Sequence, residues 1–172
     1  TLACSSVSQI GFILTGIGMQ GILGEENAIA ASGTILHMLN HSMFKLVLFL
    51  VAGVIVQNLH ALDLNEIRGF GRKKPYLMIC YLFGALGIGG IPGWSGYISK
   101  TLLHESIVEG IHHMHASHTA EIGLKCAEIV FLISGGITCA YMIKLFIAVF
   151  VEKNTTNEAK MRESDKNYLS LP

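Results

Sequence analysis

Three titratable side chains lie at helical spacing within a strongly apolar stretch of the sequence. His37, His41 and Lys45 stand at positions i, i+4 and i+8, so a helix would stack them on one face with about 6 Å of rise between neighbours. An ionised side chain costs about 3 kcal/mol at the centre of a membrane, so such residues face protein or water and mark ion paths. Histidine also titrates near neutral pH. This face of the helix therefore predicts a path that holds and passes protons.

The same three residues have a second interpretation as structural groups. Histidines can form hydrogen bonds between neighbouring membrane helices, and a lysine can extend its long side chain to the membrane surface. A single histidine would favour this structural interpretation. Three titratable residues in register favour the proton path instead.

A fourth candidate, Lys100, follows a segment whose composition does not favour a continuous helix. The segment reads GALGIGGIPGWSG, and its glycines and proline predict a helix broken near residues 91–93. Irregular backbone within a membrane must be buried or line a cavity, and broken helices beside ionisable groups recur in ion sites. We therefore expect Lys100 to hold a proton, with His104 and Glu105 extending the path outward. The alternative is a tight loop between two short helices, which would leave Lys100 at the membrane surface.

Other polar clusters favour structural roles. A run of histidines invites a metal site, because imidazole is a common zinc ligand. No cysteine accompanies the run and we expect it in a solvated turn, so we predict no metal there. Glu121, Lys125 and Glu128 stand at positions i, i+4 and i+7 and can pair along one helix face, which favours a structural role for Glu128. The histidine run consists of His112, His113, His115 and His118.

The elements that must position these residues are long apolar segments. A helix needs about 20 mostly apolar residues to span a membrane. Four segments meet this requirement: residues 2–23, 29–56, 76–110 and 122–151. Apolar residues make up 51% of the chain and charged residues 14%, which is typical of membrane proteins. The sequence therefore predicts an all-α polytopic transmembrane helix bundle with about four membrane-spanning segments, one of them a broken helix.

Charge and cysteine content exclude several classes of function. The formal net charge is zero, so nucleic acid is not an expected partner. The cysteines lie in apolar stretches without metal-ligand spacing, so neither a disulfide framework nor a zinc site is predicted. Motifs for a flavin, an iron–sulfur cluster or a nucleotide are also missing. We therefore predict no cofactor in this chain and no catalytic activity by the chain alone.

The charges of the connecting segments predict the orientation of the bundle. Arg68, Arg72, Lys73 and Lys74 follow the second apolar segment, whereas the other two connections contain no lysine or arginine. By the positive-inside rule, residues 58–75 face the cytoplasm, and the polar residues 152–172 are expected to form a cytoplasmic tail. The chain begins without a methionine and enters an apolar segment at once, so we expect an N-terminal truncation.

Three stretches, taken in order, resemble a known family. They read LACSSVSQIGFILTGIG, HMLNHSMFKLVLFLVAG and GIGGIPGWSGYISK. With the basic connection RGFGRKKP they extend over residues 2–105. They resemble the proton-translocating, antiporter-like membrane subunits of NADH:quinone oxidoreductase, of membrane-bound hydrogenases and of multisubunit cation/proton antiporters.

The resemblance implies roles for the candidate residues. His37, His41 and Lys45 would belong to a hydrated, charged axis through the middle of the membrane, and Lys100 would be the terminal proton-holding group. Residues 1–151 would form the transmembrane part of an antiporter-like proton-translocation domain. The implied function is a subunit of a redox-driven proton-translocating complex in the cell membrane. Its expected partners are the lipid bilayer, protons, and other membrane and peripheral subunits.

Two alternative functions stay open on this resemblance. A subunit of a Na⁺/H⁺ antiporter would use nearly the same residues to exchange sodium for protons. A scaffold of helices within a complex would conduct no ion at all.

Overall fold

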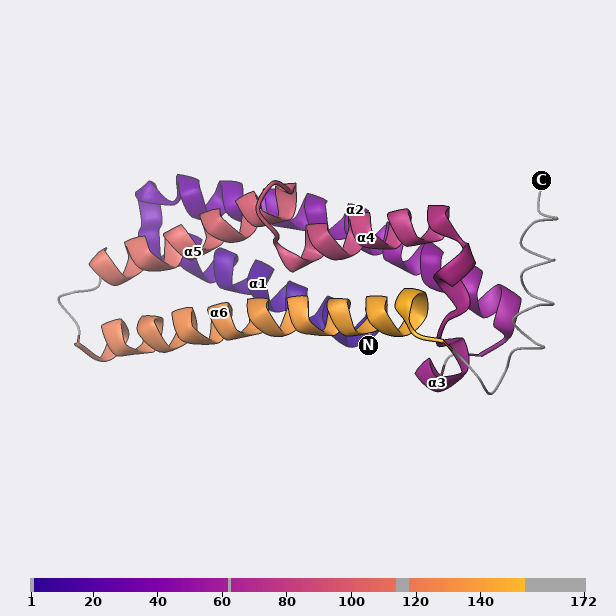
Figure 1. Cartoon of the computed structure of the whole chain (residues 1–172). Helices are drawn as coiled ribbons and strands as arrows, with labels where there is room; N and C mark the ends of the chain where they lie inside the picture. The colour runs from indigo at the N-terminus through magenta and orange to yellow at the C-terminus, as the bar shows by residue number, and fades with distance from the viewer. Residues whose placement is uncertain (1, 62, 114–117, 154–172) are drawn as a thin grey trace.

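The structure, a computed structural model, describes residues 2–61, 63–113 and 118–153. Every regular element in these residues is helical, and the long helices lie along a common axis (Figure 1). This observation confirms the predicted all-α fold. The elements are α1 (Leu2–Leu23), the 3-10 turn η1 (Gly24–Glu26), α2 (Ala28–Leu59), α3 (Leu64–Ile67), the 3-10 turn η2 (Phe70–Lys73), α4 (Pro75–Gly89), α5 (Ser95–His113), α6 (His118–Phe146) and the π-helical end η3 (Ile147–Val151).

Apolar side chains cover the outside of this bundle as well as its interior. The helical stretches Leu2–Glu26, Ala28–Leu59 and His118–Val151 are long and apolar enough to cross a membrane. Their outer faces carry large apolar side chains, of which Val7 is 71% exposed and Val130 is 65% exposed. Lipid or other membrane helices solvate such a surface far better than water does. The chain is therefore a membrane protein, and the shorter apolar helix α4 together with α5 makes up a fourth, interrupted segment.

The fourth segment breaks at its glycines and its proline. Helix α4 ends at Gly89, and Gly90 and Gly93 follow with φ angles of 76° and 96°. Glycine adopts this left-handed region without the steric penalty that a Cβ imposes. The chain then continues as α5 away from the end of α4 and does not fold back along it (Figure 1). The predicted broken helix is confirmed, including the position of the break.

Glycines allow the two halves of the broken helix to meet closely. A Cβ on Gly96, in the first turn of α5, would lie 1.8 Å from the carbonyl oxygen of Gly87 in α4. A Cβ on Gly87 would in turn lie 2.4 Å from the aromatic ring of Phe44 on α2. Any side chain at either position would therefore displace backbone or a buried ring. This packing fixes where α5 begins relative to α2 and α4.

Polar side chains in the first half of α1 join this helix to α6. Serine and glutamine side chains commonly form hydrogen bonds between membrane helices, and each pair below links one helix to the other. Hydrogen bonds within a membrane also fix the register of two helices more tightly than apolar contacts do. The pairs are Ser5 with Tyr141, Ser8 with Ser134 at 3.1 Å, and Gln9 with Thr138 at 3.4 Å.

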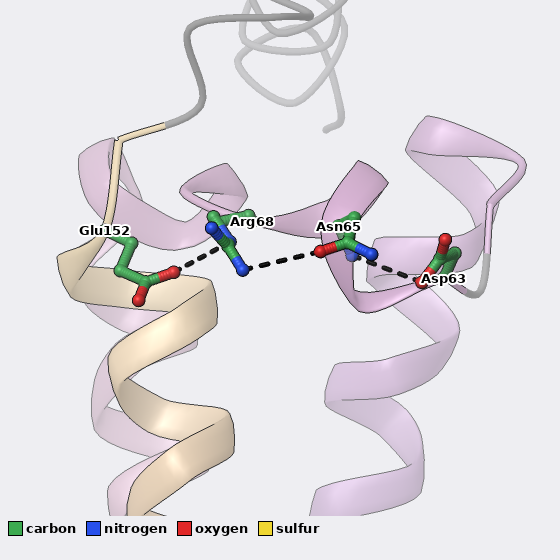
Figure 2. A network of polar contacts seen from close by, with 4 residues as sticks. All are labelled: Asp63, Asn65, Arg68 and Glu152. Carbon is green, nitrogen blue, oxygen red and sulfur yellow. Dashed lines mark hydrogen bonds and ion pairs between the residues drawn. The ribbon is translucent and has the colours of Figure 1, made fainter.

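The connection after α2 is attached to the end of the α6 segment. Figure 2 shows the contacts: Arg68 Nε lies 2.7 Å from Glu152 Oε2, and the other end of the Arg68 guanidinium donates to Asn65 Oδ1. The backbone N–H of Asn65 donates to Asp63 Oδ1, which caps the short helix α3. Residues 58–75 and the start of the predicted tail therefore lie at the same end of the bundle. The remainder of that tail lies outside the described residues.

The helix ends differ from their predicted positions by a few residues. Helix α2 continues to Leu59 rather than to residue 56, and α5 continues to His113 rather than to residue 110. Helix α6 begins at His118. Residues 111–113 contain neither glycine nor proline, so nothing in their sequence stops the helix. The predicted histidine-rich turn is therefore shorter than expected, and His115 lies outside the described residues.

Candidate functional site

Helix α2 carries the predicted stripe into the interior of the bundle. His37 is 3% exposed and Lys45 is 5% exposed, while His41 between them is half-buried. This face packs antiparallel against α5, where Asn40 Nδ2 donates to the carbonyl oxygen of Ser95 at 2.9 Å. A charged or titratable side chain in a membrane avoids lipid by such an arrangement. Lys45 in particular does not extend to the surface, contrary to the structural interpretation of the sequence.

The hydrogen bonds of His37 assign its two ring nitrogens different roles. Nδ1 lies 3.0 Å from Ser99 Oγ, and the Ser99 hydroxyl itself donates to the carbonyl oxygen of Gly96 at 3.1 Å. A serine proton directed at that carbonyl favours the neutral tautomer that carries its proton on Nδ1 and donates it to Ser99. Nε2 is then a proton acceptor, and it is buried without a hydrogen-bond partner among the described residues. His37 is thus arranged to receive a proton at Nε2.

Lys100 is held by the end of the helix that precedes the break. Its Nζ donates to the carbonyl oxygens of Ile88 at 2.8 Å and of Gly89 at 3.4 Å. These are carbonyls of the last turn of α4, which have no partner within their own helix and lie at the negative end of its dipole. The broken helix therefore supplies a binding place for a positive charge that a continuous helix would lack. This explains physically why the break and Lys100 occur together.

Phe12 on α1 lies between the histidine stripe and Lys100. Its ring packs edge-on against His37, with 5.8 Å between the ring centroids, and the Lys100 ammonium lies 5.3 Å from its centroid. An aromatic face attracts a cation without fixing it as a carboxylate would. Phe12 also packs against Phe131 of α6. Nothing in the sequence singles out Phe12, because an apolar aromatic side chain on an apolar helix is ordinary.

His41 and Lys45 lie about one and two helical turns beyond His37, towards the C-terminal end of α2. Lys45 Nζ donates to the carbonyl oxygen of Leu2 at 2.6 Å. His41 Nε2 is buried and has no hydrogen-bond partner among the residues that the structure describes. Each of the two histidines of α2 therefore offers a buried ring nitrogen with an open position.

The two residues predicted to extend the path differ in their surroundings. His104 lies one turn beyond Lys100 on α5, and its Nε2 is 3.0 Å from Glu128 Oε1 on α6. Glu105 is exposed. The structure thus places His104 beside Glu128, another titratable side chain. Glu128 was interpreted as structural in the sequence, and only its depth within an apolar segment distinguished it there.

Several other polar side chains singled out in the sequence lie away from these residues. Glu121 Oε1 accepts from Lys125 Nζ at 2.6 Å, as the i, i+4 spacing predicted, but Glu128 faces His104 and does not join that pair. All four cysteines are free. His112, His113 and His118 lie at helix ends, away from Lys100.

Six residues form a candidate relay, and we call them the relay residues: Lys45, His41, His37, Lys100 and the pair His104–Glu128. Because α2 and α5 run antiparallel, with His37 opposite Ser99, these residues follow one another along the bundle in that order. Within the described ranges, neither Lys45 nor Lys100 has a carboxylate at ion-pair distance. Their protons are held by neutral carbonyl oxygens. Such groups can take up a proton from one neighbour and give it to the next.

Comparisons with known proteins place this arrangement in a family. Residues 1–123 match the family model for the transmembrane region of NADH:quinone oxidoreductase and Mrp antiporter proteins. The chain is 30% identical to formate hydrogenlyase subunit 3 of Escherichia coli (strain K12), over 92% of this chain and 27% of that protein. It is also 30% identical to NAD(P)H-quinone oxidoreductase chain 4 2 of Trichodesmium erythraeum (strain IMS101), over 87% of this chain and 24% of the other.

An antiporter subunit is among the similar proteins as well. The Na(+)/H(+) antiporter subunit A1 of Staphylococcus haemolyticus (strain JCSC1435) is 26% identical over 99% of this chain and 22% of its own length. The chain therefore spans about a quarter of the length of the relatives that it matches. Since the family model covers residues 1–123, more than half of the sequence, the chain belongs to the NADH:quinone oxidoreductase/Mrp antiporter transmembrane family.

Proposed function

We propose that this chain forms part of the proton path in a membrane subunit of a redox-driven proton-translocating complex, of the NADH:quinone oxidoreductase or hydrogenase type. Two of its relatives carry the names of a formate hydrogenlyase subunit and a quinone oxidoreductase chain. Other membrane and peripheral subunits would then hold the electron carriers and the redox substrate. The observation that supports this proposal best is the continuous order of the relay residues through the buried contact of α1, α2 and α5.

The proposed relay moves one proton at a time along this order. A proton from Lys45 passes by way of His41 to the open Nε2 of His37, which becomes positively charged. Two positive charges repel strongly in a medium of low dielectric constant, so a proton on His37 favours release of the proton from nearby Lys100. That proton passes to His104, whose imidazolium is stabilised by the Glu128 carboxylate at 3.0 Å. Glu105, which is exposed at the next position, offers a further acceptor towards the surface.

The orientation of this path follows from the charges at the two ends of the bundle. Arg68, Arg72 and Lys73 lie at the end where α2 and α6 finish. We assign that end, with residues 58–75 and 152–172, to the cytoplasm by the positive-inside rule. His104 and Glu128 then lie on the outward side of Lys100, where the proton would be released.

Substituting Lys100 by Met in the full-length subunit tests the proposed relay. Methionine keeps most of the apolar stem but cannot carry a proton, so we expect proton pumping to fall while the complex still assembles. Lys125→Met is the matched control, because Lys125 is exposed and paired only along α6. Normal assembly with unchanged pumping in Lys100→Met would instead support a scaffold of helices that conducts no ion.

A Na⁺/H⁺ antiporter subunit is the second candidate function, and the similarity to such a subunit over 99% of this chain favours it. The two candidates differ in what drives the proton. Proton movement in vesicles that depends on an electron donor and is independent of sodium supports the redox-driven complex. Proton movement that requires a sodium gradient and no electron donor supports the antiporter.

A further inference from the structure

A cluster of potential metal ligands lies outside the relay, at the end of the bundle opposite residues 58–75. Its members are Glu26 from η1 and Glu109 and His113 from the last turns of α5. One ligand atom from each residue lies within 4.8 Å of the other two. Among the described residues, this is the one group of three histidine, cysteine or acidic side chains arranged in this way.

The fold brings the three side chains together by two simple features. Glu109 and His113 are four residues apart on α5, so they project from the same face of the helix. The end of α1 packs directly on α5 at Gly110, where a Cβ would lie 2.2 Å from Met19 Cε. This contact holds the turn that carries Glu26 against α5. The cluster thus depends on both the helix spacing and the packing of α1.

The polar atoms of the cluster are incompletely satisfied by one another. His113 Nε2 lies 2.8 Å from Glu26 Oε2. Glu109 Oε2 is buried and has no hydrogen-bond partner within residues 2–61, 63–113 and 118–153. A buried carboxylate oxygen without a partner carries a desolvation cost that a bound cation would remove. The contacts within the cluster therefore leave one carboxylate oxygen available to a ligand.

We propose that Glu26, Glu109 and His113 bind a divalent transition-metal ion of the zinc type. An imidazole nitrogen favours zinc and its relatives over magnesium and calcium, which prefer oxygen ligands alone. Three protein ligands leave the fourth position of a tetrahedral zinc ion for water. Zinc ligands at bond lengths of about 2.1 Å lie about 3.4 Å apart, so the present spacing requires only small side-chain movements. Glu26 and His113 have the freedom to make them, with 66% and 43% of their side chains exposed.

This site differs from the metal site that the histidine run suggested in the sequence. The run was rejected as a metal site, and of its members only His113 takes part in the proposed one. The two glutamate ligands come from α5 itself and from a turn more than 80 residues earlier in the chain. A bound ion would link the α1–α2 turn to the end of α5. That link is independent of whether the relay residues carry protons.

A zinc-binding measurement on the full-length subunit in detergent tests the proposal. The subunit is prepared without a histidine tag, and bound metal is removed with a chelator. Calorimetric titration with zinc chloride is expected to show one saturable site, which millimolar magnesium does not displace. Glu109→Gln and His113→Gln should each weaken zinc binding about tenfold or more. Zinc should also raise the thermal unfolding temperature of the unmodified subunit and not that of either variant.

Neighbouring residues provide matched controls for this experiment. Glu25→Gln alters the other carboxylate of the same turn, and His112→Gln alters the adjacent histidine; both should bind zinc like the unmodified protein. The thermal unfolding temperature without zinc shows that each variant is folded. Each of three results would overturn the proposal. They are the absence of saturable zinc binding, zinc affinity in the Glu109→Gln and His113→Gln variants equal to that of the unmodified protein, and complete displacement of zinc by magnesium.

Discussion

At the scale of single residues, the protein combines open proton acceptors with weakly held cations. Ser99 directs the Nδ1 proton of His37 and leaves Nε2 open, while two carbonyl oxygens at the end of α4 hold the Lys100 ammonium. A carboxylate partner would bind each cation more tightly and oppose its transfer. The exception is His104, whose partner Glu128 is a carboxylate. The last step of the proposed relay therefore has the strongest acceptor.

The His104–Glu128 pair leads to a prediction at this scale. Glutamine at position 128 keeps a hydrogen-bonding side chain of the same length but removes the charge that stabilises protonated His104. Because positioned proton-transfer groups contribute about 10²-fold or more to rates, we expect proton pumping by the full-length complex to fall about tenfold in Glu128→Gln. Electron-donor-driven pumping in vesicles measures it. The control is Glu121→Gln, which alters the acid of the Glu121–Lys125 pair; the complex with this variant should pump protons at the normal rate. A normal pumping rate in Glu128→Gln would show that Glu128 does not belong to the relay.

At the scale of elements, the broken helix determines where the relay changes helices. The proposed path follows α2 as far as His37 and then passes to α5, which begins where Gly96 meets the Gly87 carbonyl. A continuous helix would satisfy the carbonyls of Ile88 and Gly89 internally and leave Lys100 without acceptors. The break is therefore part of the site and not merely a connection.

The contact between the two halves of the broken helix gives the second prediction. A Cβ on Gly96 would lie 1.8 Å from a backbone oxygen, which no side-chain rotation can relieve. We expect Gly96→Ala to lower the free energy of unfolding by about 1–3 kcal/mol or more. Thermal or denaturant unfolding of the full-length subunit in detergent measures the change. The control is Gly123→Ala in α6, because a Cβ on Gly123 meets no atom within 4 Å. This substitution should leave the free energy of unfolding unchanged or raise it by about 0.5–1 kcal/mol. Equal stability of Gly96→Ala and Gly123→Ala would contradict the close contact between Gly96 and Gly87.

At the scale of the whole molecule, the two ends of the bundle differ in chemistry. One end carries the basic residues of the α2–α4 connection, fixed to the end of α6 by Arg68 and Glu152 (Figure 2). The other end carries Glu26, Glu109 and His113. This asymmetry sets the proposed orientation in the membrane, since lysine and arginine are retained on the cytoplasmic side. It also places the proposed metal site on the outward surface.

Cysteine labelling of the full-length subunit in oriented vesicles or cells tests this orientation. The native cysteines are first replaced by serine, and a single cysteine is then introduced at Arg72 or at Glu25, both of which are exposed. A membrane-impermeant maleimide added from the cytoplasmic side should label Arg72→Cys and not Glu25→Cys. A permeant reagent should label both variants, which controls for reactivity. The reverse labelling pattern would invert the orientation and with it the proposed direction of proton release.

The sequence by itself determined the class of fold and the main candidates of the site. Apolar segments of sufficient length specify membrane helices because the backbone in lipid must bond within itself. The glycine–proline run specified the break, because glycine adopts the left-handed backbone seen at Gly90 and Gly93 without the steric penalty of a Cβ. Periodicity placed His37, His41 and Lys45 on one face. These are local properties of the chain, and each was readable without knowledge of its neighbours.

Only the tertiary structure decided which of these groups meet. Ser99, Phe12 and Glu128 are ordinary residues in their own helices, and they gain their roles from His37, Lys100 and His104 on other elements. Glu26 and Glu109 likewise meet His113 because α1 packs on α5 at Gly110. Pairing between helices depends on their relative rotation and register, which close packing over many side chains fixes. A single sequence shows the face of each helix, but the partner of that face is a property of the bundle.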